Sequence, residues 1–167
     1  MVVDRAAVLS KRRKRRLTAA AAVFLLAMPV LASCWPQARA WRVIDGDTLD
    51  LDGERIRLFG IDAPERGQSC GPLDCGKAAT EALADILSAG PVRCTRVNTD
   101  RYARTVARCK AGRVDVNREM VRRGMAWAYR QYSDDYVSDE KAAKKSRLGI
   151  WKHRSQPAWE YRSKQLR

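Results

Sequence analysis

Histidine is nearly absent from this chain of 167 residues, because His153 is the only one. It lies in a polar segment near the carboxyl terminus, where we expect it to be inert. Structural zinc sites combine closely spaced cysteines with further cysteine or histidine ligands. Four residues separate Cys70 from Cys75, no histidine is nearby, and the other cysteines are widely separated. This pattern makes zinc a poor explanation for the cysteines.

A hydrophobic run of the length that spans a membrane is also missing. The uncharged stretch Leu17–Ala32 has 16 residues, whereas a membrane-spanning helix needs roughly 20. The basic segment Lys11–Arg16 precedes it, and this order is typical of a signal peptide. We therefore predict a signal peptide over residues 1–33, with an uncleaved membrane anchor as the alternative. Both interpretations predict an exported domain, in the cell envelope or secreted.

Two processing sites follow this stretch. Leu31–Cys34 resembles a lipoprotein signal, in which Cys34 is lipidated after cleavage, and Ala38–Ala40 resembles an ordinary A-x-A site. Because the first site closes the hydrophobic run directly, we favour membrane attachment through a lipidated Cys34. Residues 34–40 would then be a linker.

Acidic residues are few compared with basic ones: 19 Asp and Glu against 33 Lys and Arg, a formal charge of +14. Residues 1–33 carry +6 of this charge, so residues 34–167 keep +8. Such a balance favours polyanionic partners such as nucleic acids. A basic surface that merely keeps the protein soluble is the alternative.

Cysteine parity agrees with export. Without Cys34, four of the five cysteines remain, an even number that allows two disulfide bonds in an oxidising compartment. Their spacing suggests the pairs Cys70–Cys75 and Cys94–Cys109.

The residue pattern predicts an α+β domain. Asp52-Gly53 is a strong hairpin turn between two β-rich stretches, and three more strands follow the first helix. The predicted strands are Trp41–Leu51, Glu54–Ile61, Val92–Val97, Thr105–Lys110 and Val114–Val116. The predicted helices are Lys77–Ser88, a short helix capped by Asn117 and ending at Gly124, and Val137–Leu148. This order suits a five-stranded Greek-key β-barrel of the OB type with three helices, in which the first strand bends to serve twice.

Acidic residues gather at two points of the first hairpin. Asp45 and Asp47 lie on its first arm and Asp62 follows its second arm. Carboxylates are hard oxygen ligands that suit calcium or magnesium. A flat hairpin would pair Asp62 with Val43, about 13 Å from Asp47, so a metal site requires a bend, which we place at Gly46. Turn and surface carboxylates are the alternative.

Five segments, in order and with family-like spacing, resemble the staphylococcal nuclease family: Val43–Thr48, Arg57–Glu65, Asp100–Arg104, Val116–Ala126 and Leu148–Trp151. The resemblance covers residues 41–152 and leaves 153–167 as a basic polar tail. It implies an OB-type domain with calcium-dependent nuclease activity on DNA and RNA.

The resemblance also implies roles for individual residues. Asp47 and Asp62 would be the Ca²⁺ carboxylates, Ala63 would supply its main-chain carbonyl, and Asp45 would support the site. Arg57 and Arg104 would hold the phosphate, and Glu65 would be the general base. The substrate-binding residues would be Arg101, Tyr102, Tyr129 and Tyr132. The loop Arg66–Gly76 departs from the family's best-known member, so we expect substrate access to differ.

A non-catalytic binding module of the cell envelope is the alternative function, since some family domains keep the barrel and lose the catalytic set. That set is complete here, which favours an enzyme. A structural envelope lipoprotein would explain the amino terminus but not the motifs. No protein partner is evident, and we expect a monomer.

The two processing sites make different mature proteins, which gives the first testable prediction. We expect mass spectrometry of the mature protein to find an amino-terminal Cys34 that carries lipid. An amino-terminal Trp41 would instead show cleavage at the A-x-A site and a soluble secreted form.

Overall fold

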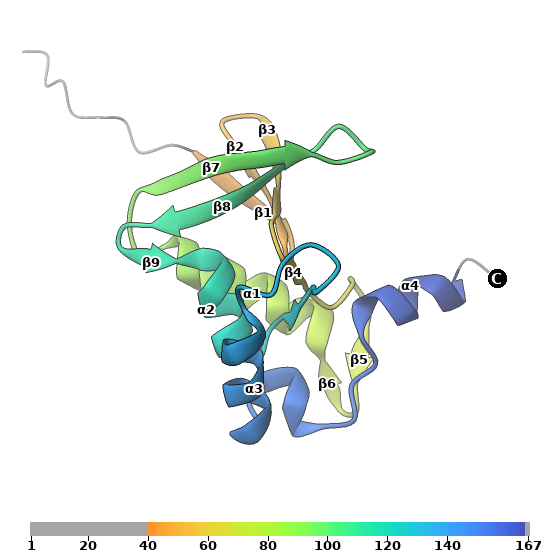
Figure 1. The fold of residues 1–167 in the computed structure, drawn as a ribbon. Coiled ribbons are helices and arrows are strands. Elements are labelled where there is room, and N and C mark those ends of the chain that lie inside the picture. Colours follow the sequence, from red (N-terminus) through yellow and green to blue (C-terminus); the bar gives the residue numbers. More distant parts are fainter. Residues whose placement is uncertain (1–39, 166–167) are drawn as a thin grey trace, which may run out of the picture. The chain divides into compact units, whose positions relative to one another are not determined.

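The structure is a computed structural model that describes residues 40–165. The predicted signal peptide, both processing sites and Cys34 lie outside the described residues. Figure 1 shows a curled sheet with helices beside it, which confirms the predicted α+β class. In the part that is described, no helix has both the length and the apolar character needed to cross a membrane.

One curled sheet forms the centre of the fold. Its strands run in the order β1 (Trp41–Asp45), β2 (Thr48–Leu51), β3 (Glu54–Leu58), β8 (Thr105–Ala111) and β7 (Val92–Thr99), and β9 (Val114–Asp115) pairs with β8. The β3–β8 pair is parallel, whereas the other pairs are antiparallel. This half-barrel agrees with the predicted OB-type architecture.

The predicted bend at Gly46 is present and divides the first β-rich stretch into β1 and β2. Asp45 faces Thr48 across this pair, so the chain reverses between them. A Cβ atom at Gly46 would lie 2.7 Å from the Cβ atoms of both Ala63 and Ala79. Glycine therefore allows the turn to approach the chain after β3 and the helix beneath it.

Three helices match the predicted ones: α1 (Cys75–Leu87), α2 (Val116–Arg122) and α3 (Val137–Lys145). The remaining short elements are β4 (Ile61–Asp62), β5 (Ser69–Cys70), β6 (Leu73–Asp74), β10 (Trp127–Ala128) and the 3₁₀ helix η1 (Gly149–Lys152). The buried side of α1 belongs to the same core as the inner side of the sheet. The pairing of β4 with β10 fixes the chain beside the acidic residue Asp62.

A fourth helix, α4 (Ala158–Gln165), lies in the segment that we treated as a polar tail. Ala158 is fully buried, and the ring of Trp159 lies 6.1 Å from that of Trp127. The Gln68 side chain also donates a 2.7 Å hydrogen bond to the carbonyl of Gln156, just before the helix. The sequence did not predict α4 because two apolar anchors at one end form no helical stripe.

The predicted cap of α2 is wrong. Asp115 caps this helix, whereas Asn117 is buried inside it. The Asn117 side chain accepts a 2.9 Å hydrogen bond from the Cys109 amide and donates to the carbonyls of Phe59 and Ala107 at 2.9 and 3.2 Å. Asn117 therefore joins α2 to β8 and to the end of β3.

Both predicted disulfides are formed. Cys94 and Cys109 face each other directly in the β7–β8 pair. Cys70 and Cys75 join β5 to the first turn of α1, so the loop that follows Glu65 is closed on itself. We expect each disulfide to stabilise the fold by about 2–4 kcal/mol. The Cys70–Cys75 disulfide closes the shorter loop and should contribute less than Cys94–Cys109.

Asn117 gives a stability prediction. Asn117→Ala should lower the free energy of unfolding by about 3 kcal/mol, because it leaves buried backbone groups without partners. Denaturant titration measures this loss. Asn98→Ala, at an exposed position of β7, is the matched control and should change stability by less than about 0.5 kcal/mol. Equal effects of the two substitutions would contradict this role for Asn117.

Candidate active site

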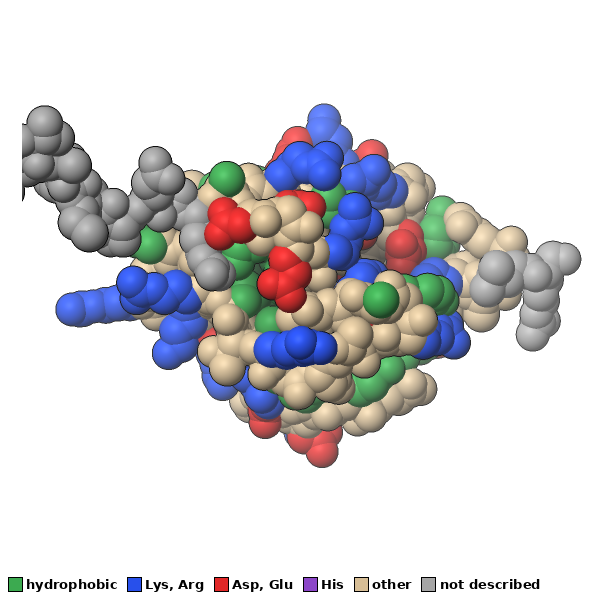
Figure 2. Space-filling model, turned by 90° about the horizontal axis from the view of Figure 1, so that it is seen from above, with side chains coloured by type: hydrophobic (Ala, Val, Ile, Leu, Met, Phe, Trp, Pro, Cys, Tyr) green, Lys and Arg blue, Asp and Glu red, His purple; other side chains and the backbone are tan. Residues whose placement is uncertain are grey.

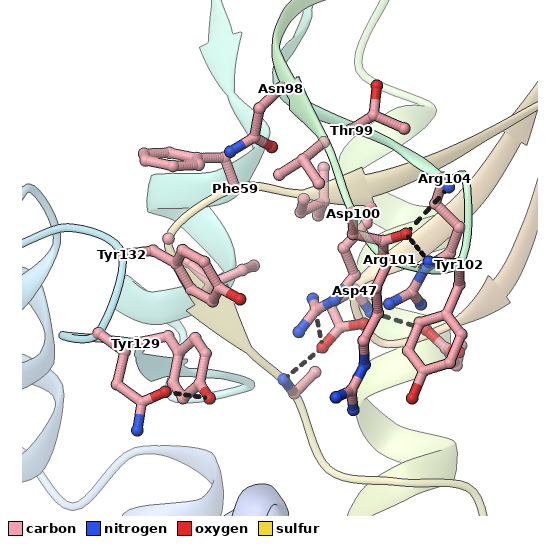
Figure 3. A pocket seen from close by; sticks show the side chains of 18 of the residues that line it. Asp47, Phe59, Asn98, Thr99, Asp100, Arg101, Tyr102, Arg104, Tyr129 and Tyr132 are labelled. Atoms are coloured by element: carbon pink, nitrogen blue, oxygen red, sulfur yellow. Dashed lines mark hydrogen bonds and ion pairs between the residues drawn. The ribbon is translucent and has the colours of Figure 1, made fainter.

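A cavity of about 570 Å³ opens where the β1–β2 turn, the chain after β3 and the β7–β8 hairpin meet. The structure brings nearly all the predicted site residues to its wall: Asp45, Asp47, Arg57, Ala63, Glu65, Arg101, Tyr102, Arg104, Tyr129 and Tyr132. Figure 3 shows many of these side chains pointing into the same space. Asp62 is fully buried behind the wall and contacts the cavity through Arg57.

Arg57 is the central cation of the cavity. It lies on β3 opposite Thr48, and its Nη1 atom is 2.6 Å from Asp47 Oδ2 while its Nη2 atom is 2.8 Å from Asp62 Oδ1. The amide of Ala63 donates a further 2.7 Å hydrogen bond to Asp47 Oδ2. The ion pair with Asp47 and the hydrogen bonds to Asp62 and from Ala63 connect the β1–β2 turn, β3 and β4.

Negative charge is concentrated around Asp47. Burial raises the pKa of Asp47 to about 7; Arg57 opposes this shift, while Asp45 and Asp62 add to it. Asp45 also accepts a 3.1 Å hydrogen bond from the Asp47 amide, which orients the turn. Because the like charges of the three aspartates disfavour each other's ionised form, a cation bound among them would be stabilised.

These residues fit a calcium ion by their donor chemistry. Within residues 40–165 no three or more His, Cys, Asp or Glu side chains are arranged around a common metal position, and the carboxylates of Asp47 and Asp62 pair with arginines. Both nevertheless supply oxygen donors beside Ala63, because Asp62 precedes it in the chain and Asp47 accepts a hydrogen bond from its amide. Asp47, Asp62 and the Ala63 carbonyl could therefore supply the hard ligands that calcium prefers.

The β7–β8 hairpin forms one wall of the cavity. Asp100 accepts hydrogen bonds from the amides of Tyr102 and Arg104 at 2.8 and 3.0 Å, and from Arg104 Nε at 2.7 Å. Although burial acts in the opposite direction, these bonds lower the pKa of Asp100. The guanidinium groups of Arg101 and Arg104 lie 4.9 and 5.6 Å from the centre of the exposed Tyr102 ring, so Asp100 fixes both an arginine and an aromatic surface.

Aromatic side chains also form the opposite wall. The ring centres of Tyr129 and Tyr132 are 5.2 Å apart, and Tyr129 lies 5.6 Å from Trp159 of α4. Figure 3 shows Tyr129 and Tyr132 on the other side of Asp47 from Tyr102. The charged centre of the cavity is therefore flanked by exposed rings.

Arg162 of α4 also lines the cavity, although the sequence did not predict it as a site residue. Its Nη1 and Nη2 atoms donate to Asp62 Oδ1 and Oδ2, each at 3.1 Å, and Nη1 also contacts Glu65 Oε1. Burial and these two carboxylates act on the guanidinium in opposite directions, and the carboxylates prevail, so the pKa of Arg162 is raised. No sequence feature distinguishes Arg162 from the other basic residues of its segment, and only the docking of α4 brings it to Asp62.

Basic side chains are widely distributed outside the cavity. On the face shown in Figure 2, Lys and Arg side chains lie in several separate groups with Asp and Glu between them. The positive charge of this face is thus not gathered into one continuous stripe.

The comparisons with known proteins agree with this geometry. The family model described as staphylococcal nuclease homologue matches residues 55–153. A micrococcal nuclease of Shigella flexneri is 36% identical over 165 residues, covering 88% of this chain and 91% of that protein. An uncharacterized endonuclease of Haemophilus influenzae is 36% identical over 137 residues, covering 76% of this chain and 74% of that protein. A thermonuclease of Staphylococcus intermedius is 37% identical over 122 residues, covering 66% of this chain and 73% of that protein.

The family model and the relatives, which are matched over most of their length, support a hydrolytic nuclease. The match of the family model and the extent of these identities show that the chain belongs to the staphylococcal nuclease family.

The raised pKa of Asp47 predicts a pH dependence of stability. Because folded Asp47 holds its proton up to about pH 7 and an unfolded aspartate only to about 3.8, the metal-free folded state binds more protons between these values. Its free energy of unfolding should therefore fall as the pH rises from about 4 to 7, relative to Asp47→Asn. Urea titrations in EDTA measure both proteins. If the free energies of unfolding of the two proteins depended on pH in the same way, the raised pKa of Asp47 would be contradicted.

Proposed function

We propose that this protein is a calcium-dependent phosphodiesterase that hydrolyses DNA and RNA. Its membership of the staphylococcal nuclease family supports hydrolytic nuclease chemistry. The observation that carries the finer proposal is the placement of Arg57 between two buried carboxylates, in a cavity that also contains Glu65 and Arg104. This arrangement provides oxygen ligands, phosphate-binding cations and a possible base in one place.

Asp47, Asp62 and the Ala63 carbonyl would hold calcium, with Asp45 as a supporting carboxylate. When bound, calcium would draw negative charge from a phosphoryl oxygen and position the attacking water. The raised pKa of Asp47 reflects a site that favours an added positive charge.

The two predicted phosphate-binding arginines are held in different ways. Arg57 is fixed by its bonds to Asp47 and Asp62, whereas Arg104 is held by Asp100 at the edge of the hairpin. Guanidinium groups match phosphate oxygens bidentately and stay charged. Both would stabilise charge that grows on the phosphoryl oxygens in the transition state.

Glu65 would accept the proton of the attacking water. Its amide donates a 3.0 Å hydrogen bond to the side chain of Gln68, which is almost fully buried. This bond fixes the backbone of Glu65, while 35% of its side chain stays exposed to the cavity. A partly exposed carboxylate near the reacting phosphate suits a general base.

The aromatic walls support a broad substrate range. Tyr102 on one side and Tyr129 with Tyr132 on the other present ring faces on which bases could stack, with Arg101 beside Tyr102. Stacking tolerates any base, because every base has a π-face. Single-stranded segments of either nucleic acid would suit such a cavity.

Export is part of the proposal. The two disulfides support an oxidising compartment such as the cell envelope or the exterior. We propose attachment through lipidated Cys34 and a monomer that needs no protein partner. A non-catalytic binding module would have no use for the complete set of carboxylates and arginines around Arg57.

The direct experiment is incubation of the purified mature protein with plasmid DNA and with RNA. We expect cleavage of both in calcium and none in excess EGTA. Full cleavage in EGTA would contradict the calcium dependence, whereas binding without cleavage in calcium would favour the binding module.

Substitutions in the cavity give a kinetic prediction. Glu65→Gln should lower kcat by about 10²–10⁴ through loss of the base, and Arg104→Ala by roughly 10²–10³ through loss of a transition-state donor. Arg104→Lys should restore little, because an ammonium group lacks the bidentate fork. Steady-state kinetics on folded variants measure these effects. The control Glu81→Gln, on the exposed side of α1, should leave kcat unchanged.

Calcium titration separates catalysis from metal binding in the same variants. Glu65→Gln should bind calcium nearly as well as the control does, because Asp47 and Asp62 remain. Wild-type kcat in both Glu65→Gln and Arg104→Ala would refute the catalytic assignment.

A further inference from the structure

Helix α4 is attached to the cavity independently of its arginine. Ala158 is fully buried, Trp159 packs edge-on against Trp127 and beside Tyr129, and the carbonyl of Gln156 accepts a bond from Gln68. Gln68 also holds the Glu65 backbone. The start of α4 and the loop of the proposed base therefore form one packed unit, and Arg162 extends from it one helical turn further along.

Arg162 makes its contacts at the metal-facing carboxylates rather than at the surface. Two of its nitrogen atoms bond the two oxygens of Asp62, which is fully buried, and one of them also contacts Glu65. The Arg162 side chain is itself 40% exposed and lines the cavity. Its guanidinium can thus leave Asp62 for open space without disturbing the buried anchors of α4.

We propose that Arg162 is a tethered counter-ion of the active site, which neutralises Asp62 and Glu65 until a calcium ion takes its place on Asp62. This inference rests on the calcium site of the proposed function. Arg57 already uses Asp62 Oδ1, and Arg162 uses both oxygens. A cation that binds Asp62 therefore competes with Arg162 for the same lone pairs.

The competition has two consequences. Because two cations repel each other strongly at a few ångströms in a partly buried site, Arg162 weakens calcium binding whether or not it moves. By reciprocity, calcium weakens the pairing of Arg162 with Asp62 by the same factor. The released guanidinium stays within the cavity, where a phosphate anion is its next partner.

Calcium affinity of the metal-free mature protein tests the proposal without substrate. Arg162→Gln should tighten calcium binding, measured by isothermal titration calorimetry, by about tenfold or more. Lys164→Gln is the matched control, since it removes the same charge from an exposed position of the same helix. It should change the affinity by less than about twofold. An unchanged or weaker affinity in Arg162→Gln would overturn the proposal.

A second measurement uses the wild-type protein, so it does not depend on the folding of a variant. Nuclear magnetic resonance of the arginine side chains should show that calcium speeds hydrogen exchange at the Arg162 guanidinium. Unchanged protection of Arg162 in saturating calcium would overturn the displacement. A wild-type protein that binds no calcium would instead refute the proposed function, which distinguishes the two failures.

Discussion

The fully buried carboxylate of Asp62 is the constraint on which the rest of the site depends. An uncompensated buried charge costs several kcal/mol, so it must be paired or bound to a metal. Arg57 from β3 and Arg162 from α4 provide that pairing. Arg57 also reaches Asp47 in the β1–β2 turn. The ion pairs of one aspartate thus bring together elements from opposite ends of the described chain.

The same constraint connects stability with function. Burial raises the pKa of Asp47, and repulsion from the carboxylates of Asp45 and Asp62 adds to that shift. Arginines relieve this repulsion in the metal-free chain, and a bound cation would relieve it in the active one. Calcium binding and arginine pairing would therefore be alternative ways to balance the same charges. The exposed rings of Tyr102 and Tyr132 take no part in these ion pairs and remain available for substrate.

Much of the fold could be predicted from local residue patterns. The turn at Asp52-Gly53, the three helices and both disulfides follow from turn chemistry, apolar spacing and cysteine spacing. The bend at Gly46 was predictable because a flat hairpin would separate Asp47 from Asp62. The structure shows its physical reason, which is the close approach of this turn to Ala63 and Ala79.

The remaining features depend on distant contacts. Asn117 is a good helix cap by type, but Asp115 takes that place and Asn117 satisfies backbone groups of β8 and of the chain after β3. Arg162 lies in a polar segment, and α4 is placed by tertiary packing of Trp159 rather than by an apolar stripe. Among 33 basic residues, the roles of Arg57 and Arg104 came from the family resemblance rather than from composition.

We propose above all that Asp47 and Asp62 form the calcium site of a phosphodiesterase. A crystal structure with calcium, with the ion identified by anomalous scattering, tests it most directly. We expect one calcium ion bound to the carboxylates of Asp47 and Asp62 and to the carbonyl of Ala63, with the guanidinium of Arg162 withdrawn from Asp62. A structure in saturating calcium that has no ion at these residues, and in which Arg162 is still paired with Asp62, would contradict this calcium site.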